Sequence, residues 1–182
     1  MRGDPVLYHF SEEPNISAFV PRPVRVPARR PEGQDWLNGP LVWAIDEQHQ
    51  PMYLFPRECP RILLWTVAAT TPADVKRWFG ATDAGVIAHI EWAWFERLRT
   101  GQIVRYCLPP ESFIDLDDAG MWVSRETVLP TAVETIVDLP AAMREAGVEL
   151  RVLPSLLPLR GVWETTLHAS GIRLRNAEGW ET

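Results

Sequence analysis

Short runs of β-branched and aromatic residues recur along the chain, and several of them alternate apolar with polar positions. Alternation with a period of two is typical of strands that bury one face, and a short unbroken apolar run is typical of a strand buried on both faces. We therefore predict strands at 6–10, 41–45, 61–69, 85–90, 103–108, 121–124, 133–137, 148–153 and 171–174.

Capping residues and apolar positions at helical spacing predict the helices. Thr71 followed by Pro72 is typical of a helix start, because threonine caps the free N–H groups and proline fits the first helical position. Gly80 follows the last apolar residue of that segment and is expected to end it. We predict further helices at 90–99 and at 138–146, the latter capped by Asp138, and a helix or broken helix at 155–166.

These elements follow one another without a regular strand–helix alternation, which favours an α+β fold over a doubly wound parallel sheet. A chain of 182 residues has room for one domain. We predict a single domain over residues 1–182, in which a twisted, mixed sheet of short strands is flanked by three or four helices.

Two segments lack such patterns. Residues 20–33 contain four prolines and four arginines, with Glu32 as the one acid, so they cannot form a central strand or a helix. We predict an irregular surface loop there, and a loose tail over residues 176–182.

Charge and cysteine content narrow the partners. The net charge is −6, whereas nucleic-acid-binding proteins usually carry a basic excess, so a nucleic-acid partner is not expected. The two cysteines form no CxxC pair, and no metal site is expected. Most of the nine tryptophans are expected in the core, because an indole ring buries a large apolar area.

The sequence also bears on location and on nucleotide-binding folds. No run approaches the roughly 18 apolar residues of a membrane span, and the N-terminus lacks an apolar signal-peptide core of about 7 to 15 residues. We expect a cytoplasmic protein without a membrane partner. The chain contains neither GxGxxG nor GxxxxGK followed by Ser or Thr, which argues against two common nucleotide-binding folds.

Four long strings point to a family. They are LYHFSEEPNISAFVPR at 7–22, VWAIDEQHQPMYLFPRECPR at 42–61, VELRVLPSL at 148–156 and SGIRLRNA at 170–177. Together they resemble a family of bacterial proteins known as a domain of unknown function. That resemblance spans nearly the whole chain and implies no activity.

The opening Leu-Tyr-His is also similar to the first motif of ADP-ribosyltransferase-like domains. The resemblance implies that His9 contacts the nicotinamide riboside part of NAD, that Tyr53 stacks on nicotinamide, and that Glu149 on a late strand activates the acceptor. The chain departs from that pattern, because Phe10 follows His9 and no Ser-Thr-Ser motif opens the middle strand.

The residues themselves leave two interpretations of His9 and Glu149 open. His9 faces a cleft or solvent if Tyr8 and Phe10 point into the core, and otherwise it is a half-buried structural histidine. Glu149 shares a strand face with Arg151, so the two form either a solvated ion pair or a general base with its orienting partner.

The segment 53–61 combines an aromatic residue, prolines and arginines. Prolines on both sides of the 57–59 stretch stiffen the backbone. Arg57 and Arg61 there suit a phosphate or carboxylate, or else they pair with acids of the same fold. Cys59 would need a base such as His49 to act as a nucleophile.

Two late arginines extend this interpretation. Arg173 and Arg175 lie two positions apart near Asn176, so their side chains fall on one face of the predicted last strand. They either extend a phosphate site or are solvated.

The function that these observations favour is a small ADP-ribosyltransferase-like domain that binds NAD or a related nucleotide. His9, Tyr53, Arg57 and Arg61 would bind the cofactor, and Glu149 and His9 would be catalytic. The alternatives are a module that binds a small anionic ligand without catalysis, and a structural or interaction protein.

Overall fold

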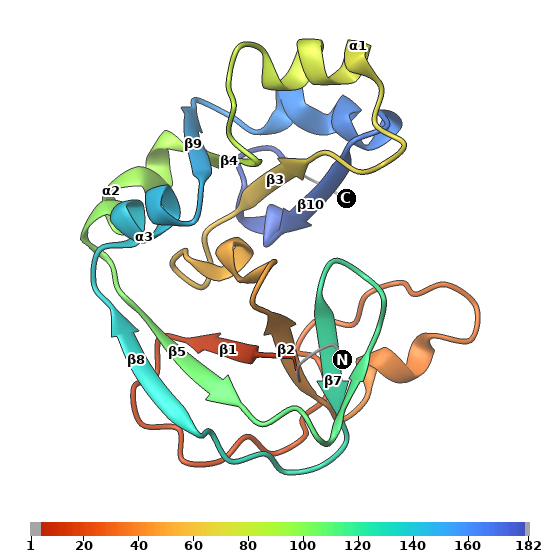
Figure 1. The fold of residues 1–182 in the computed structure, drawn as a ribbon, viewed down its shortest axis with the longest axis vertical. Helices are drawn as coiled ribbons and strands as arrows, with labels where there is room; N and C mark the ends of the chain where they lie inside the picture. The colour runs from red at the N-terminus through yellow and green to blue at the C-terminus, as the bar shows by residue number, and fades with distance from the viewer. Residues whose placement is uncertain (1–4, 181–182) are drawn as a thin grey trace. The chain divides into compact units, whose positions relative to one another are not determined.

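The computed structural model describes residues 5–180, and its ribbon is drawn in Figure 1. Packing within the chain divides it into two compact units. Unit 1 contains residues 5–50 and Ile103–Ile136, and unit 2 contains Pro51–Gln102 and residues 137–180. The prediction that the whole chain is one domain stays a prediction.

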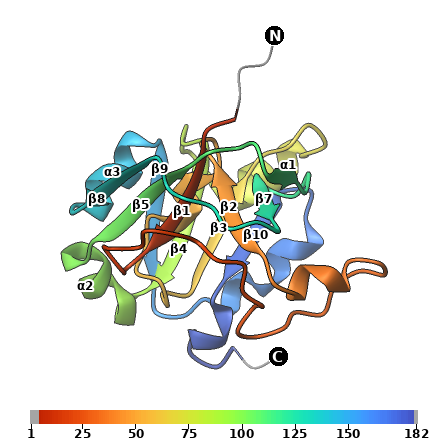
Figure 2. The ribbon, with the colours of Figure 1, turned by 90° about the horizontal axis from the view of Figure 1, so that it is seen from below.

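Unit 1 is built on one antiparallel sheet. Its strands are β1 (Leu7–Ser11), β2 (Val42–Asp46), β5 (Ile103–Leu108), β6 (Phe113–Asp115), β7 (Met121–Ser124) and β8 (Ala132–Ile136). They lie in the order β6-β7-β2-β1-β5-β8, and Figure 2 shows β1 next to β2 and β5. A single 3-10 turn, η1 (Asp35–Asn38), completes the regular structure of this unit among the described residues.

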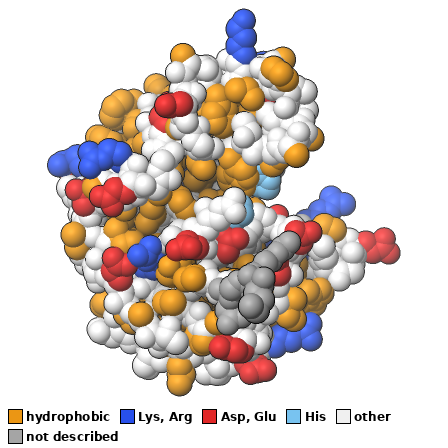
Figure 3. All heavy atoms as spheres, viewed as in Figure 1, with side chains coloured by type: hydrophobic (Ala, Val, Ile, Leu, Met, Phe, Trp, Pro, Cys, Tyr) orange, Lys and Arg blue, Asp and Glu red, His pale blue; other side chains and the backbone are white. Residues whose placement is uncertain are grey.

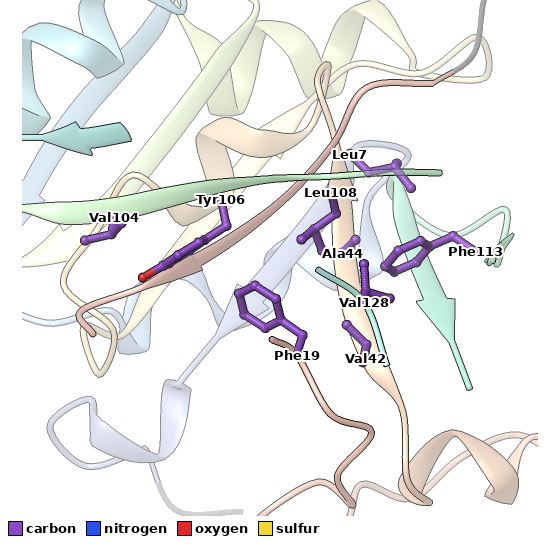
Figure 4. Close-up of a cluster of buried hydrophobic side chains, with 9 residues drawn as sticks. All are labelled: Leu7, Phe19, Val42, Ala44, Val104, Tyr106, Leu108, Phe113 and Val128. Carbon is purple, nitrogen blue, oxygen red and sulfur yellow. The ribbon is translucent and has the colours of Figure 1, made fainter. Parts of the chain in front are cut away.

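A cluster of apolar side chains forms one core of unit 1 (Figure 4). The edge of the Phe19 ring meets the ring of Tyr106 at 5.2 Å between centroids, and Tyr106 is fully buried. The cluster consists of Leu7, Phe19, Val42, Ala44, Val104, Tyr106, Leu108, Phe113 and Val128.

Strand β1 packs against this core with the face that carries Leu7, not with the face that carries Tyr8 and Phe10. Leu7 and Ser11 are buried, whereas Tyr8 and Phe10 are half-buried on the opposite face and contact each other edge to face. Since side chains alternate along a strand, His9 points to the same side as Leu7. The condition under which His9 would face a cleft is therefore not met.

Unit 2 contains a mixed sheet of four strands. These are β3 (Arg61–Trp65), β4 (Val86–Glu91), β9 (Val148–Leu153) and β10 (His168–Ile172), in the order β10-β3-β4-β9. The β4–β9 pair is parallel and the other two pairs are antiparallel. Ile62, Leu64, Ile87 and Leu156 are fully buried in the core cluster of this unit.

All α-helices of the described chain belong to unit 2. They are α1 (Pro72–Asp74), which continues into the π-helical turn η3 (Val75–Phe79), α2 (Trp92–Thr100) and α3 (Leu139–Glu145). Shorter 3-10 segments are η2 (Gln50–Tyr53, which begins at the last residue of unit 1), η4 (Leu157–Glu164) and η5 (Leu174–Asn176).

The capping signals act as the sequence predicts. The Thr71 hydroxyl accepts a hydrogen bond from the Asp74 N–H, and the Asp138 carboxylate accepts one from Ala141 at the start of α3. Gly80 ends the η3 turn with φ of 72°, a left-handed conformation that favours glycine.

The α+β class is confirmed, with the strands divided between two sheets. The loop at 20–33 is irregular and mostly exposed, as predicted. The helix expected from residue 90 begins two residues later, because Ile90 pairs with Val152 in the sheet. None of the helices in residues 5–180 is long and apolar enough to cross a membrane.

The last predicted strand and the tail differ from expectation. Strand β10 ends at Ile172, and the chain then turns at Arg173, which has a left-handed φ of 56°. Ala177 is buried and Trp180 packs against the core of unit 2, so residues 176–180 are not loose. Residues 181–182 lie outside the described part of the chain.

Candidate functional site

The segment before β3 is folded into a tight turn. The Cys59 N–H donates to the Pro56 carbonyl at 2.9 Å, which places Arg57 and Glu58 at the two central positions of the turn. Phe55 and Cys59 on either side are buried. The turn is therefore anchored in the core while its two charged side chains project from it.

Strand register brings the end of β10 to this turn. Arg61 at the start of β3 lies opposite Ile172 at the end of β10. The residues before Arg61 and the residues after Ile172 therefore meet, although more than 100 positions separate them. The left-handed turn at Arg173 redirects the chain where they meet.

Glu58 is the centre of the charges gathered there. Its carboxylate lies 3.6 Å from Arg173 Nε and 3.2 Å from Arg175 Nη2, and it accepts a hydrogen bond of 3.1 Å from Asn176 Nδ2. Burial raises the pKa of Glu58, but Asn176 and the nearby arginines, Arg57 among them, outweigh burial and lower it. The carboxylate is thus held in its charged form.

Arg61 is the buried member of this group, with 2% of its surface exposed. Its Nε donates to the Met52 carbonyl at 2.8 Å and its Nη1 to the Cys59 carbonyl at 2.9 Å, and its guanidinium lies over the rings of Tyr53 and Phe55. Within residues 5–180 it makes no ion pair. Burial lowers the pKa of Arg61 to about 10, so it stays charged at neutral pH.

We call Arg57, Arg61, Arg173 and Arg175 the arginine cluster. Arg61, Arg173 and Arg175 alone outnumber the carboxylate of Glu58 by two charges, in a chain of net charge −6. Burial also lowers the pKa of Arg173. Figure 3 shows, at its left, basic side chains that lie directly beside acidic ones. An arginine excess of this kind is suited to an anionic ligand.

Glu149 is held in a different arrangement. Its carboxylate accepts a 2.7 Å hydrogen bond from Arg151 Nε, and the other two nitrogens of Arg151 donate to the carbonyls of Trp78 and Phe79 at 2.8 and 2.7 Å. These are carbonyls at the end of η3. Hydrogen bonding from Thr82 and from Arg151 lowers the pKa of Glu149. We call this arrangement the Arg151 bracket, and its geometry favours a structural role for Glu149.

His9 lies in unit 1, whereas Tyr53, Arg57, Arg61 and Glu149 lie in unit 2. The His9 Nδ1 is 2.8 Å from the Trp43 carbonyl, and its ring lies 4.6 Å from that of Phe19 in the core. This is the environment of a half-buried structural histidine. The catalytic and cofactor-binding role of His9 stays a prediction.

The thiol of Cys59 is unsuited to nucleophilic chemistry. It is fully buried, and burial raises its pKa to about 12, so the reactive thiolate is scarce at neutral pH. His49, the base it would need, belongs to unit 1, where its Nδ1 pairs with the Asp46 carboxylate at 2.8 Å.

The residues that sequence reasoning missed are Glu58 and Asn176. Neither stands out by type, and both become part of the site through the register of β3 and β10. Within the part of the chain that the structure describes, no three His, Cys, Asp or Glu side chains gather in a way that could hold a metal ion.

Comparison with known proteins identifies a family. Residues 8–177 match the model of a family of unknown function, DUF6886. The chain belongs to this family. The match includes every residue of the arginine cluster, the Arg151 bracket and His9. No curated protein matches the chain, and no solved structure matches it. The similarity of this DUF6886 protein to ADP-ribosyltransferases stays a prediction.

Proposed function

We propose that this protein binds a small anionic ligand at the arginine cluster of unit 2. The observation that carries the proposal is the convergence of arginines from two distant segments on one carboxylate, with a net positive excess. Ordinary surface ion pairs match one arginine with one acid and contribute little to stability. Gathering several guanidinium groups is unfavourable by itself, and an anion that binds several of them offsets this repulsion.

The support for a phosphate or carboxylate as the bound group comes from the arginine side chain. A guanidinium group presents five N–H donors in a planar fork, which matches the oxygens of these anions. Arg173 and Arg175 reach the surface with 33% and 45% of their side chains exposed, so a dissolved ligand can approach them. Arg61 lies behind them and adds charge from a buried position.

NAD and ADP-ribose are the nucleotides that this proposal covers first. Their pyrophosphate would be the anion bound by the arginine cluster, with Tyr53 available as an aromatic neighbour because it already packs against Arg61. Binding of the nucleotide requires no catalytic step by Glu149, whose carboxylate accepts a hydrogen bond from Arg151.

The test is ligand-induced stabilisation. Thermal unfolding is followed with inorganic phosphate, ADP-ribose and NAD over a range of concentrations. A ligand at 100 times its dissociation constant is expected to stabilise the protein by about 2.7 kcal/mol. Calorimetric titration of Arg175→Gln is expected to show affinity weakened by about tenfold, because one charge-assisted hydrogen bond is lost.

Arg99→Gln is the matched control. Arg99 is an exposed arginine of unit 2 that pairs with Glu96 of its own helix at 2.6 Å. Its replacement removes the same charge and is expected to leave affinity unchanged. An absence of stabilisation by all three compounds, or equal loss of affinity in both variants, would contradict the proposal.

A further inference from the structure

The carboxylate of Glu58 occupies the position in which an external anion would meet the arginine cluster. Arg175 and Asn176 donate to it, and Arg173 Nε lies 3.6 Å away while donating to the Arg57 carbonyl at 3.4 Å. Arg173 directly follows β10, and Arg175 and Asn176 belong to η5, while Glu58 itself belongs to the turn before β3. The chain thus supplies both the donors of an anion site and an anion that fills it.

Glu58 is held more loosely than other carboxylates paired with arginine in this unit. Its separations of 3.2 and 3.6 Å from the two arginines exceed the 2.7 Å of Glu149 with Arg151 and the 2.6 Å of Glu96 with Arg99. Charge-assisted hydrogen bonds are typically about 2.7–2.9 Å long. The donors around Glu58 are therefore spaced for a larger group of oxygens than one carboxylate provides.

The turn is built so that the Glu58 side chain can leave without unfolding it. The Glu58 carbonyl accepts a 2.7 Å hydrogen bond from Asn176 Nδ2, and the Cys59 N–H bonds to the Pro56 carbonyl. Both bonds use the backbone and do not involve the carboxylate. The side chain is 45% exposed, so it can rotate into solvent while the backbone stays in place.

From these observations we propose that the Glu58 carboxylate occupies the anion site when no ligand is bound, and that the ligand which displaces it carries two negative charges on a phosphate monoester or a pyrophosphate group. This inference rests on the proposed function. Exchanging the Glu58 carboxylate for a ligand carboxylate replaces one negative charge by one negative charge. A phosphate monoester or a pyrophosphate brings a second negative charge and more acceptor oxygens, which can bind to the arginines of the cluster.

The experiment measures affinity by calorimetry at pH 7.5 for phenyl phosphate, benzoate and ADP-ribose. Wild-type protein is expected to bind phenyl phosphate about tenfold more tightly than benzoate. Glu58→Gln keeps the shape and removes the competing charge, so both affinities are expected to rise about fivefold, the worth of an exposed ion pair. Glu58→Ala is expected to give the same rise in affinity. An equal rise in both variants shows that it comes from loss of the carboxylate and not from a contact between the new glutamine and the ligand.

Glu96→Gln is the matched control, because it removes one negative charge from another exposed acid paired with an arginine. It is expected to leave all three affinities unchanged. Tighter binding of ADP-ribose than of phenyl phosphate would support a pyrophosphate as the natural group, and weaker binding would support a phosphate monoester.

The two proposals fail in different ways. If Glu58→Gln and Glu58→Ala leave affinity unchanged or weaken it, while Arg175→Gln still weakens binding about tenfold, Glu58 does not compete with the ligand and this inference is overturned. Equal affinity for benzoate and phenyl phosphate would overturn the dianion assignment. If no probe binds to wild-type protein or to either Glu58 variant, the proposed function itself is overturned.

Discussion

The Arg151 bracket and the arginine cluster both combine arginine with glutamate in unit 2, but they differ in how closely the two are paired. In the bracket, the three guanidinium nitrogens of Arg151 donate hydrogen bonds to Glu149 and to two backbone carbonyls, at 2.7 to 2.8 Å. In the cluster, Glu58 is shared among several donors at 3.1 Å and beyond. In the first arrangement one arginine pairs with one glutamate, and in the second Arg61, Arg173 and Arg175 outnumber Glu58.

This difference separates a structural ion pair from a candidate binding site. A guanidinium whose donors all reach close protein acceptors has little to offer a ligand. One that faces a distant, shared and exposed carboxylate can change partners at small cost. Substitutions in and next to the bracket are therefore expected to change the free energy of unfolding more than substitutions in the cluster.

The largest effect is expected from His89, which lies opposite Arg151 in the β4–β9 pair. Burial lowers the pKa of His89 to about 4, from an ordinary value of 6.5. The unfolded chain therefore takes up a proton between pH 6.5 and 4 that the folded chain does not, so stability falls as the pH drops through this range. The loss attributable to His89 is about 3 kcal/mol, measured by urea unfolding at several pH values.

His89→Gln is expected to flatten that pH dependence, whatever it does to stability at pH 7. His168→Gln serves as the control, because His168 is a half-buried histidine on β10 that stacks on Trp65. An unchanged pH dependence in His89→Gln would show that His89 is not the group responsible.

A smaller loss is expected when the bracket is broken. Arg151→Met keeps the aliphatic stem and removes the hydrogen bonds to Trp78, Phe79 and Glu149. Hydrogen bonds to charged groups contribute about 1.5–3 kcal/mol, and partial exposure reduces this, so a loss of about 2 kcal/mol is expected in urea unfolding. A loss below that of Arg175→Met would reverse the comparison.

The smallest effect on stability is expected at the cluster. Glu58→Gln removes an exposed carboxylate whose ion pairs are long, so unfolding free energy should change by less than about 1 kcal/mol. The measurement is the same urea titration at pH 7, without ligand. A loss as large as that of Arg151→Met would mean that Glu58 is structural and would weaken its assignment to a ligand site.

Local patterns predicted the elements well and the site in part. Alternation located β1 and β9, the Thr71 and Asp138 caps located two helix starts, and the spacing of Glu149 and Arg151 placed them on one face. The anion-binding interpretation of residues 57–61 came from residue type and proline placement, which are also local.

What sequence could not provide is the pairing of distant segments. The role of Glu58 depends on the β3–β10 register, which sets Arg61 opposite Ile172. The core face of β1 was also ambiguous, because large side chains lie on both of its faces, Leu7 on one and Tyr8 and Phe10 on the other, and only the neighbouring strands decide which side is buried. Strand register and the buried face of a strand depend on tertiary packing, which the β-propensity of single residues does not determine.

The division of each unit between two stretches of chain has a consequence during synthesis on the ribosome. The chain passes from one unit to the other three times, after residues 50, 102 and 136. Strand β1 pairs with β5, about 100 residues later, so at translation rates of roughly 5–20 residues per second it waits for several seconds. Until then only β2 is available to it, and its other edge stays open to unwanted partners. We therefore expect the nascent chain to depend on chaperones until β5 has emerged.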